Sequence, residues 1–289
     1  MRGNVGVPDF LAVGHLCCDI VDGRRILGGS ASYASLTARG LNRAAGILTA
    51  VAEDFPFLHL LKGIRVDIID SPTTTTFRNI YHQGVREQII CDVARSIGPA
   101  DVPGEFTNVD VVYLCPIADE ILPGVASRFR ASLVGAGAQG WFRQWDEAGR
   151  VSRKKWESAL EVARAVDVIV YSELDTDDPY KLAEELANHA PVVIVTQSSL
   201  GADLYTEGAR IHVPAFDVEE IDPTGAGDVF AAAFLINYES SGNAVESAKF
   251  ACCAASFICE HEGTEGIPSL DQVEERLQQY SRIYSESLY

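Results

Sequence analysis

The chain has 289 residues, 47% of them hydrophobic and 22% charged, and carries a formal net charge of −18 at pH 7. This composition is typical of a folded protein and excludes a disordered or fibrous chain. The negative charge argues against nucleic-acid and anionic-membrane partners, because both require a basic face on the protein.

Length and cysteine content set further limits. The length suits a single domain over residues 1–289, and residues 1–10 contain no apolar run that could act as a signal peptide or membrane span. Seven cysteines include two adjacent pairs and none of the spacings that zinc sites use. We therefore expect a cytoplasmic protein with reduced, mostly buried thiols.

Short apolar runs indicate buried strands along most of the chain. They occupy residues 9–14, 45–51, 64–69, 109–115, 131–136, 167–171 and 191–196. Stretches with helical spacing lie at residues 28–41, 121–130, 156–165, 179–188, 225–238, 243–261 and 269–285. This alternation predicts a three-layer α/β/α fold whose mostly parallel central sheet is covered on both faces.

Two segments interrupt the alternation. Residues 73–92 are rich in β-branched and aromatic side chains around His82-Gln83-Gly84, which predicts a hairpin. Together with residues 22–28 this hairpin is expected to form a small β-flap, or lid. Residues 202–213 predict a second hairpin, which turns at Glu207-Gly208.

The segment Asp222-Pro-Thr-Gly-Ala-Gly-Asp228 precedes an apolar helix rich in alanine. Amides at a helix N-terminus are unsatisfied, and glycines let a phosphate approach them, so Gly225, Ala226 and Gly227 are predicted to form an anion hole. Asp228 would stand beside a phosphoryl group and could take the proton from an attacking hydroxyl. The alternative is a plain tight turn in which Asp228 only complements the helix dipole.

The same string resembles the C-terminal signature of the ribokinase-like carbohydrate kinases, the PfkB family, and the resemblance covers nearly the whole chain. It implies an enzyme that uses ATP and Mg²⁺ to phosphorylate a hydroxyl of a small sugar or polyol, with K⁺ activation left open. Residues 13–19 and 28–34 are similar to the family's N-terminal motifs. They imply a sugar site lined by Asp19, Gly28 and Gly29, with Ser32 where many members carry an asparagine.

The segments that correspond to the family's nucleotide-binding motifs match less well. The segment Ser172-Glu173-Leu174-Asp175 resembles the family's Asn-x-x-Glu, which implies that Glu173 and Asp175 act on the metal through water. The segment from Thr196 to Gly201 resembles Thr-x-Gly-x-x-Gly with Ser198 in place of the first glycine, and these three residues are expected to bind ATP. Residues 263–268, beginning at Gly263, are similar to the loop that closes over the adenine.

Three local segments, residues 13–19, 120–123 and 139–143, look like the myo-inositol kinase branch of the family. This likeness makes Arg143 a candidate contact to the substrate or a phosphate. Gly137 stands where that branch commonly has an aspartate.

Several alternatives stay open at this point. A nucleoside kinase shares the scaffold, and the serines at 172 and 198 motivate a non-catalytic sugar or nucleotide sensor. The segment Gly135-Ala-Gly-Ala-Gln-Gly140 satisfies Gly-x-Gly-x-x-Gly and would suit a dinucleotide-dependent oxidoreductase, but no clean helical pattern follows it and it lies mid-chain. A small-molecule kinase is therefore the preferred prediction, either as a monomer or as a homodimer.

Overall fold

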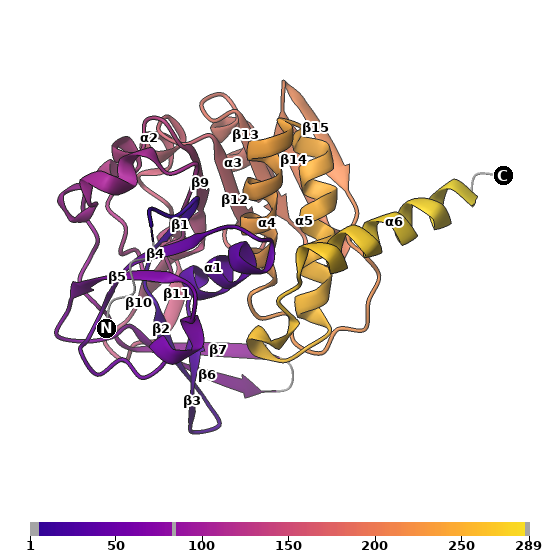
Figure 1. Cartoon of the computed structure of the whole chain (residues 1–289). Coiled ribbons are helices and arrows are strands. Elements are labelled where there is room, and N and C mark those ends of the chain that lie inside the picture. The colour runs from indigo at the N-terminus through magenta and orange to yellow at the C-terminus, as the bar shows by residue number, and fades with distance from the viewer. Residues whose placement is uncertain (1–5, 83–84, 287–289) are drawn as a thin grey trace.

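A nine-stranded sheet runs through the centre of the computed structural model, which describes residues 6–82 and 85–286 (Figure 1). Within these residues the strand order is β15 (Ala209–Val213), β14 (Ala202–Thr206), β13 (Val192–Thr196), β12 (Val168–Ser172), β9 (Leu133–Gly137), β8 (Val111–Leu114), β1 (Phe10–Val13), β4 (Ala45–Val51) and β5 (Arg65–Asp70). The strands from β13 to β5 are parallel, whereas β14 pairs antiparallel with both β13 and β15. This arrangement confirms the predicted α/β class.

Both faces of the sheet are covered, because successive strand residues point to opposite sides. In β8, Val111 and Tyr113 belong to the core beneath the long helices, whereas Val112 and Leu114 belong to the core on the opposite face. The helices on the first face are α1 (Ser30–Gly40), α4 (Ala226–Ser241) and α5 (Ala244–Cys259). The second face carries α2 (Ala159–Ala163), α3 (Pro179–Leu186) and the 3-10 helices Gly104–Asn108 and Pro123–Arg128.

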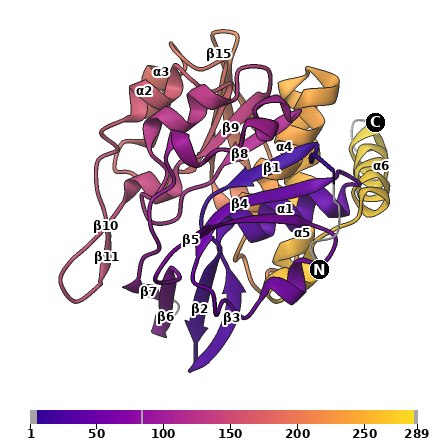
Figure 2. The same cartoon turned by 60° about the vertical axis from the view of Figure 1, so that its left-hand side comes forward.

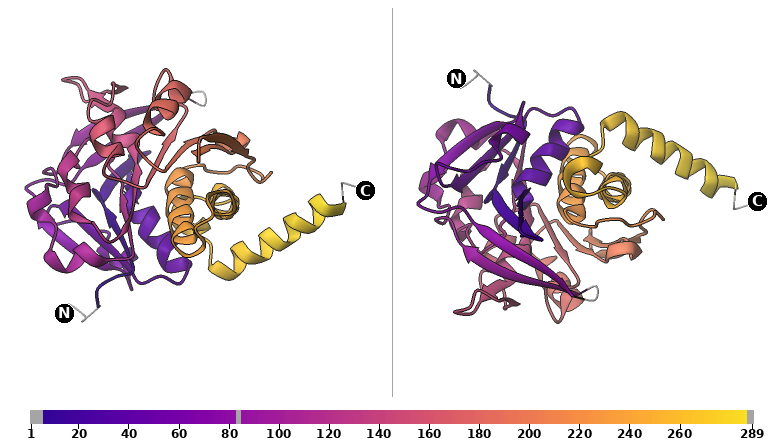
Figure 3. Two further views of the ribbon diagram at one scale, coloured as in Figure 1. Left: turned by 90° about the horizontal axis from the view of Figure 1, so that it is seen from above. Right: turned by 90° about the horizontal axis from the view of Figure 1, so that it is seen from below.

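The helix pair α4–α5 fixes the first residues of α4 above the sheet. Gly242 ends α4 with φ 65, and the side chain of Asn243 caps α5 by accepting from the amides of Val245 and Glu246, each at 3.1 Å. A Cβ at Gly135 would lie 2.5 Å from Leu235, so the glycine in β9 lets α4 approach the sheet closely. Beyond α5, the helix α6 (Leu270–Glu286) buries Val273 and then projects from the body (Figure 3).

A separate four-stranded sheet stands at one end of the molecule, with the order β3 (Arg24–Gly28), β2 (Cys17–Val21), β6 (Thr76–His82) and β7 (Val85–Asp92) (Figure 2). It unites the two segments expected to form the flap, although the turn residues 83–84 lie outside the described residues. A short hairpin of β10 (Arg143–Trp145) and β11 (Val151–Arg153) reaches the same sheet, where the amide of Ile90 donates to the carbonyl of Gly149 at 2.8 Å.

Some predicted elements differ from the structure. Residues 121–130 contain a 3-10 helix, Pro123–Arg128, rather than an α-helix. Pro123 is its first residue, where proline is tolerated, and Gly124, which follows, is a weak helix former. The stretch 156–165 yields only the five-residue helix α2. Among the described residues, no helix is both long and apolar enough to span a membrane. All seven cysteines are free, and five of them are buried.

Candidate active site

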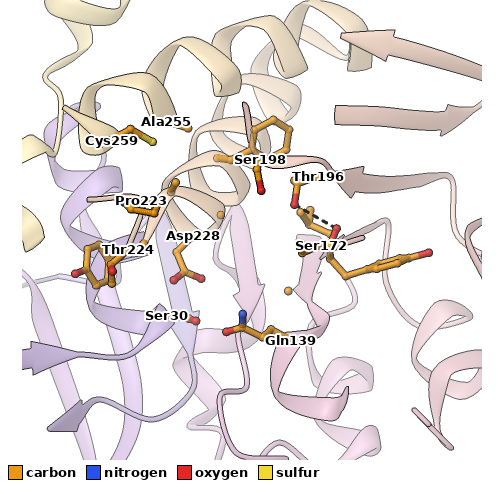
Figure 4. Close-up of a pocket in the computed structure, with 18 of the residues that line it drawn as sticks. Ser30, Gln139, Ser172, Thr196, Ser198, Pro223, Thr224, Asp228, Ala255 and Cys259 are labelled. Atoms are coloured by element: carbon orange, nitrogen blue, oxygen red, sulfur yellow. Dashed lines mark hydrogen bonds between the residues drawn. The ribbon is translucent and has the colours of Figure 1, made fainter. Parts of the chain in front are cut away.

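A cavity of about 700 Å³ opens at the carboxyl edge of the parallel strands. The strand order reverses at β1, because β1 pairs with β4 on one side and with β8 on the other. In open α/β sheets, ligands bind outside the carboxyl ends of the strands at this kind of switch point. The four-stranded sheet, the start of α4 and the side of α5 supply the remaining walls (Figure 4).

The turn before α4 lies on the wall of this cavity. Gly225 has φ 85, which glycine adopts readily, and a Cβ there would lie 2.3 Å from the ring of Tyr33. The amides of Ala226 and Asp228 are used within the turn, donating to Pro223 and Gly225 at 3.1 and 3.0 Å. In the described part of the chain, no protein acceptor pairs with the amide of Gly227. The turn predicted to act as an anion hole thus forms the N-terminus of α4, with two of its amides engaged in this structure, and its binding of a phosphate stays a prediction.

Asp228 lines the cavity and is partly buried. Figure 4 shows its carboxylate directed toward Ser30 and Gln139. Burial raises the pKa of Asp228 to about 6, while a hydrogen bond from Ser30, the charge of Arg143 and a hydrogen bond from Tyr113 act in the lowering direction. A carboxyl group with this pKa is ionised at neutral pH but is a stronger base than an ordinary aspartate.

On one side of Asp228 the cavity is lined by side chains suited to an uncharged polar ligand. Asp19 and Gly29 contribute from the motif region, and Phe77 and Gln88 contribute from the four-stranded sheet. A Cβ at position 28 would lie 2.1 Å from the Oδ2 atom of Asp19, so Gly28 acts here by leaving space for that carboxylate rather than by lining the cavity.

Arg143 extends from β10 into the same part of the cavity. Its guanidinium donates to the carbonyl of Ile117 at 2.9 Å and lies 5.6 Å from the centre of the Phe77 ring. Of the described residues that line the cavity, Arg143 alone is positively charged. The carboxylates on the lining are Asp19, Asp175, Asp217, Glu220 and Asp228.

The expected role of Ser32 requires correction. Ser32 is fully buried in the first turn of α1, and its hydroxyl donates to the carbonyls of Gly28 and Gly29 at 3.1 and 2.7 Å. Successive residues on a helix point about 100° apart, so residues three apart lie on nearly the same face. Ser30 and Tyr33 share the face that lines the cavity, and Ser32 points away from it.

Thr196, Ser198 and Gly201, which the resemblance implied for ATP binding, all line the cavity, and that role stays a prediction. Ser198 has φ 51 and thus keeps the left-handed conformation that glycine usually supplies. A shelf of largely apolar residues adjoins them, formed by Phe216, Val218, Cys252, Ala255 and Cys259. Gly263 lies outside the lining, but its amide donates to Asp222 at 3.1 Å and so ties its loop to the start of the Asp222–Asp228 segment.

The two carboxylates proposed to act on a metal are separated by the fold. Asp175 lines the cavity and accepts from the amide of Ser172 at 2.8 Å, and burial raises its pKa. Glu173 points away from the cavity lining and accepts from the hydroxyl of Tyr180 at 2.9 Å. In residues 6–82 and 85–286, no three His, Cys, Asp or Glu side chains cluster as a complete metal site.

Four cavity residues could not be identified as a group from local motifs: Ser30, Tyr33, Tyr113 and Gln139. Ser30, Tyr33 and Gln139 lay within segments singled out for their resemblance to the family but were given no role, and Tyr113 carried no signal of its own. The glycine-rich segment 135–140 ends β9 and continues into a 3-10 helix, Ala138–Phe142, instead of the α-helix that a dinucleotide site requires.

A carboxylate beside a glycine turn at a helix N-terminus, in a cavity at the switch point of a mostly parallel sheet, defines a small-molecule phosphotransferase site. Residues 155–270 match the model of the pfkB family of carbohydrate kinases. With the kinases described next, this match indicates a phosphotransferase with an alcohol group as acceptor.

Similar proteins span much of the chain. Cytidine kinase from Thermococcus kodakarensis is 27% identical, with 82% of this chain and 91% of that protein covered. Inositol 3-kinase from Oryza sativa is 28% identical, with 81% and 65% covered. A pyrophosphate-dependent kinase of the ribokinase family, solved with a pyrophosphate analogue and myo-inositol, superposes with a TM-score of 0.76 at 21% identity, covering 92% of this chain and 99% of that one. These structural likenesses confirm a ribokinase-like fold.

Proposed function

We propose that this enzyme transfers the terminal phosphoryl group of ATP to a hydroxyl of an uncharged sugar or polyol, with myo-inositol as the first candidate acceptor. The observation that carries the proposal is Asp228, a partly buried carboxylate with a pKa of about 6 that lines the cavity beside the turn at the start of α4. The acceptor hydroxyl gives its proton to Asp228 as its oxygen forms a bond to the terminal phosphorus. The bond from that phosphorus to the leaving diphosphate oxygen breaks in the same step.

The charge of the cavity supports an uncharged acceptor. Five carboxylates and the single guanidinium of Arg143 line it, so a sugar phosphate would meet net repulsion and would have one charged partner at most. Hydroxyl groups of a polyol match Asp19, Gln88 and Gln139 as hydrogen-bond partners. The inositol 3-kinase and cytidine kinase similarities agree with acceptors of this kind.

ATP is the proposed donor because the shelf formed by Phe216, Val218, Cys252, Ala255 and Cys259 adjoins the phosphate side of the cavity and can accept a flat base. Asp175 and Asp228 are the carboxylates that would hold Mg²⁺ through water. When bound, Mg²⁺ neutralises charge on the donor phosphates. Pyrophosphate is a second candidate donor, because three similar solved structures come from work on pyrophosphate-dependent kinases of this fold.

The four-stranded sheet β3-β2-β6-β7 is proposed to act as the lid of the acceptor side. It contributes Asp19, Phe77 and Gln88 to the cavity wall, so its position determines how much water reaches the reacting groups.

Product formation with Mg²⁺ and either ATP or pyrophosphate tests the proposal across myo-inositol, ribose, fructose, fructose phosphates and cytidine, with and without K⁺. We expect turnover with an unphosphorylated acceptor and a loss of at least a thousandfold in Asp228→Asn. Near-normal turnover in Asp228→Asn would exclude it as the base. Preference for a fructose phosphate would contradict the charge argument, and activity with pyrophosphate alone would replace the donor.

A further inference from the structure

A buried carboxylate behind the cavity has no role in the site described above. Glu120 follows β8, has an exposed fraction of 1%, and does not line the cavity. It opens the segment 120–123, which stood out in the sequence and which the proposed function leaves unused. A buried charge is costly unless hydrogen bonds compensate it, so the partners of Glu120 indicate what it does.

Both oxygens of the Glu120 carboxylate accept from backbone amides. Oε1 accepts from His15 at 3.0 Å and from Ile117 at 3.1 Å. Oε2 accepts from Ile117 at 2.9 Å and from Ala118 at 2.7 Å, and the imidazole of His15 lies 4.0 Å from Oε1. The carboxylate thus fixes the loop after β8 against the link between β1 and β2.

The loop that Glu120 holds supports Arg143 in turn. The guanidinium of Arg143 donates to the carbonyl of Ile117 at 2.9 Å, so Ile117 is held by Glu120 through its amide and holds Arg143 through its carbonyl. The chain leading to Arg143 rests on the same loop. The amide of Gly140 donates to the carbonyl of Pro116 at 3.0 Å, and a Cβ at position 140 would lie 2.3 Å from that carbonyl carbon.

The placement of Arg143 matters because it is the one cation among the described residues that line the cavity. Its guanidinium lies 5.6 Å from the centre of the Phe77 ring, on the side of the cavity that also contains Asp19. A long side chain loses rotamer freedom when it binds a ligand, and a fixed protein partner removes part of that cost in advance. A residue that fixes this partner therefore affects binding without touching the ligand.

We propose that Glu120 is a positioning residue for the acceptor site: it holds the loop after β8 so that the carbonyl of Ile117 directs the Arg143 guanidinium toward the oxygens of the acceptor. This inference rests on the proposed function, in which an uncharged acceptor binds beside Asp19 and Arg143. A carboxylate is required at position 120, because both of its oxygens accept from amides. Glutamine would turn an NH₂ group toward an amide donor in either orientation.

The first experiment is a double-mutant cycle with myo-inositol and Mg-ATP, in which cytidine replaces myo-inositol if the latter is not turned over. Arg143→Gln should raise the acceptor KM about thirtyfold and Glu120→Gln about fivefold, with the ATP KM within about twofold. Adding Glu120→Gln to Arg143→Gln should change the acceptor KM less than about twofold, because the group through which Glu120 acts is gone. A full second loss would overturn the proposal.

Asp167→Asn is the matched control. Asp167 precedes β12, accepts from the amide of Val134 at 2.8 Å, and does not line the cavity. Asp167→Asn and Glu120→Gln should both lower the urea midpoint, but only Glu120→Gln should change the acceptor KM. An equal rise of the acceptor KM in both would attribute the effect to lost stability and overturn the proposal. If Glu120→Gln fails to fold, Glu120→Asp replaces it in each comparison, since it keeps the charge and withdraws the carboxylate by one methylene.

A second readout needs no acceptor. The Nε–H signal of Arg143 in the free protein is identified by its loss in Arg143→Gln, and ¹⁵N relaxation gives its order parameter. We expect a value of about 0.85 in the parent and in Asp167→Asn, and below about 0.6 in Glu120→Gln. An unchanged order parameter in Glu120→Gln would show that Glu120 does not hold Arg143 and would overturn the proposal.

These outcomes are distinguishable from failure of the proposed function. Turnover that survives in Asp228→Asn would refute the proposed base and leave the order parameter of Arg143 as a separate result. An inactive Asp228→Asn, beside an unchanged acceptor KM in both Arg143→Gln and Glu120→Gln, would refute the positioning role alone.

Discussion

The raised pKa of Asp228 predicts that this carboxylate, the proposed catalytic base, destabilises the folded protein at neutral pH. A pKa raised from 3.8 to about 6 corresponds to about 3 kcal/mol at 1.36 kcal/mol per pH unit. The sign follows from proton binding: the folded state holds this proton more tightly than the unfolded state. The contribution to stability is therefore fully present below about pH 4 and is lost as pH rises through about 6.

Asp228→Asn removes the charge and keeps the shape, so it should stabilise the protein at pH 7.5 by up to about 3 kcal/mol and at pH 4 by only about 0.5 kcal/mol. For a chain of this length the neutral-pH gain amounts to roughly 5 °C in Tm. Urea and thermal unfolding of both proteins at the two pH values measure the effect. An Asn variant that is less stable than the parent at pH 7.5, or equally stabilised at both pH values, would refute the reasoning.

Four further predictions concern the same cavity. The rate under kcat/KM conditions should fall about tenfold per pH unit below pH 6, as Asp228 protonates, and a flat profile down to pH 5 would contradict its raised pKa. Gly225→Ala should cost about 1–3 kcal/mol in urea unfolding, because φ is 85 and the new Cβ meets a tyrosine ring; unchanged stability would refute this packing. Asp175→Asn should raise the Mg²⁺ concentration needed for half-maximal rate at least tenfold while Glu173→Gln changes it little, and the reverse order would exchange their roles. Asp19→Asn should raise the acceptor KM about tenfold with the donor KM unchanged, whereas equal effects on both would place Asp19 outside the acceptor site.

The sequence allowed most of the fold to be predicted, because strands buried on both faces appear as continuous apolar runs. Residues 45–51 coincide with β4, and the expected hairpin at 202–213 matches β14 and β15. Helical spacing was less reliable at 121–130, where a proline and a glycine set a 3-10 geometry. The small strand β2 was not expected, because its five residues belong to a motif interpreted only for its chemistry.

Some residues of the candidate site could likewise be predicted from the sequence, and others could not. Asp228 and its glycine turn are contiguous in sequence, so a local motif was sufficient to predict that they lie together at the N-terminus of one helix. Ser30 and Tyr113 line the same cavity as Asp228 only because α1, β8 and α4 pack together, and no spacing in the sequence encodes that proximity. Ser32 was expected in the cavity. The residue that lines it is Ser30, two positions earlier in α1.

The hairpin β10–β11 joins two parts of the molecule that a moving lid would separate. Gly149, at its tip, has φ 77 and approaches Ile90 of β7 so closely that a Cβ would lie 2.3 Å from the Ile90 carbonyl oxygen. Arg150 also lies 3.6 Å from Glu87 of the same strand. Any displacement of β7 must break these contacts or carry the hairpin with it, and Arg143 stands at the base of that hairpin. Arg143, the only positive charge among the described lining residues, is thus linked through the hairpin to β7. If the four-stranded sheet moves as the proposed lid, the electrostatic potential felt by the carboxylates would change with its position.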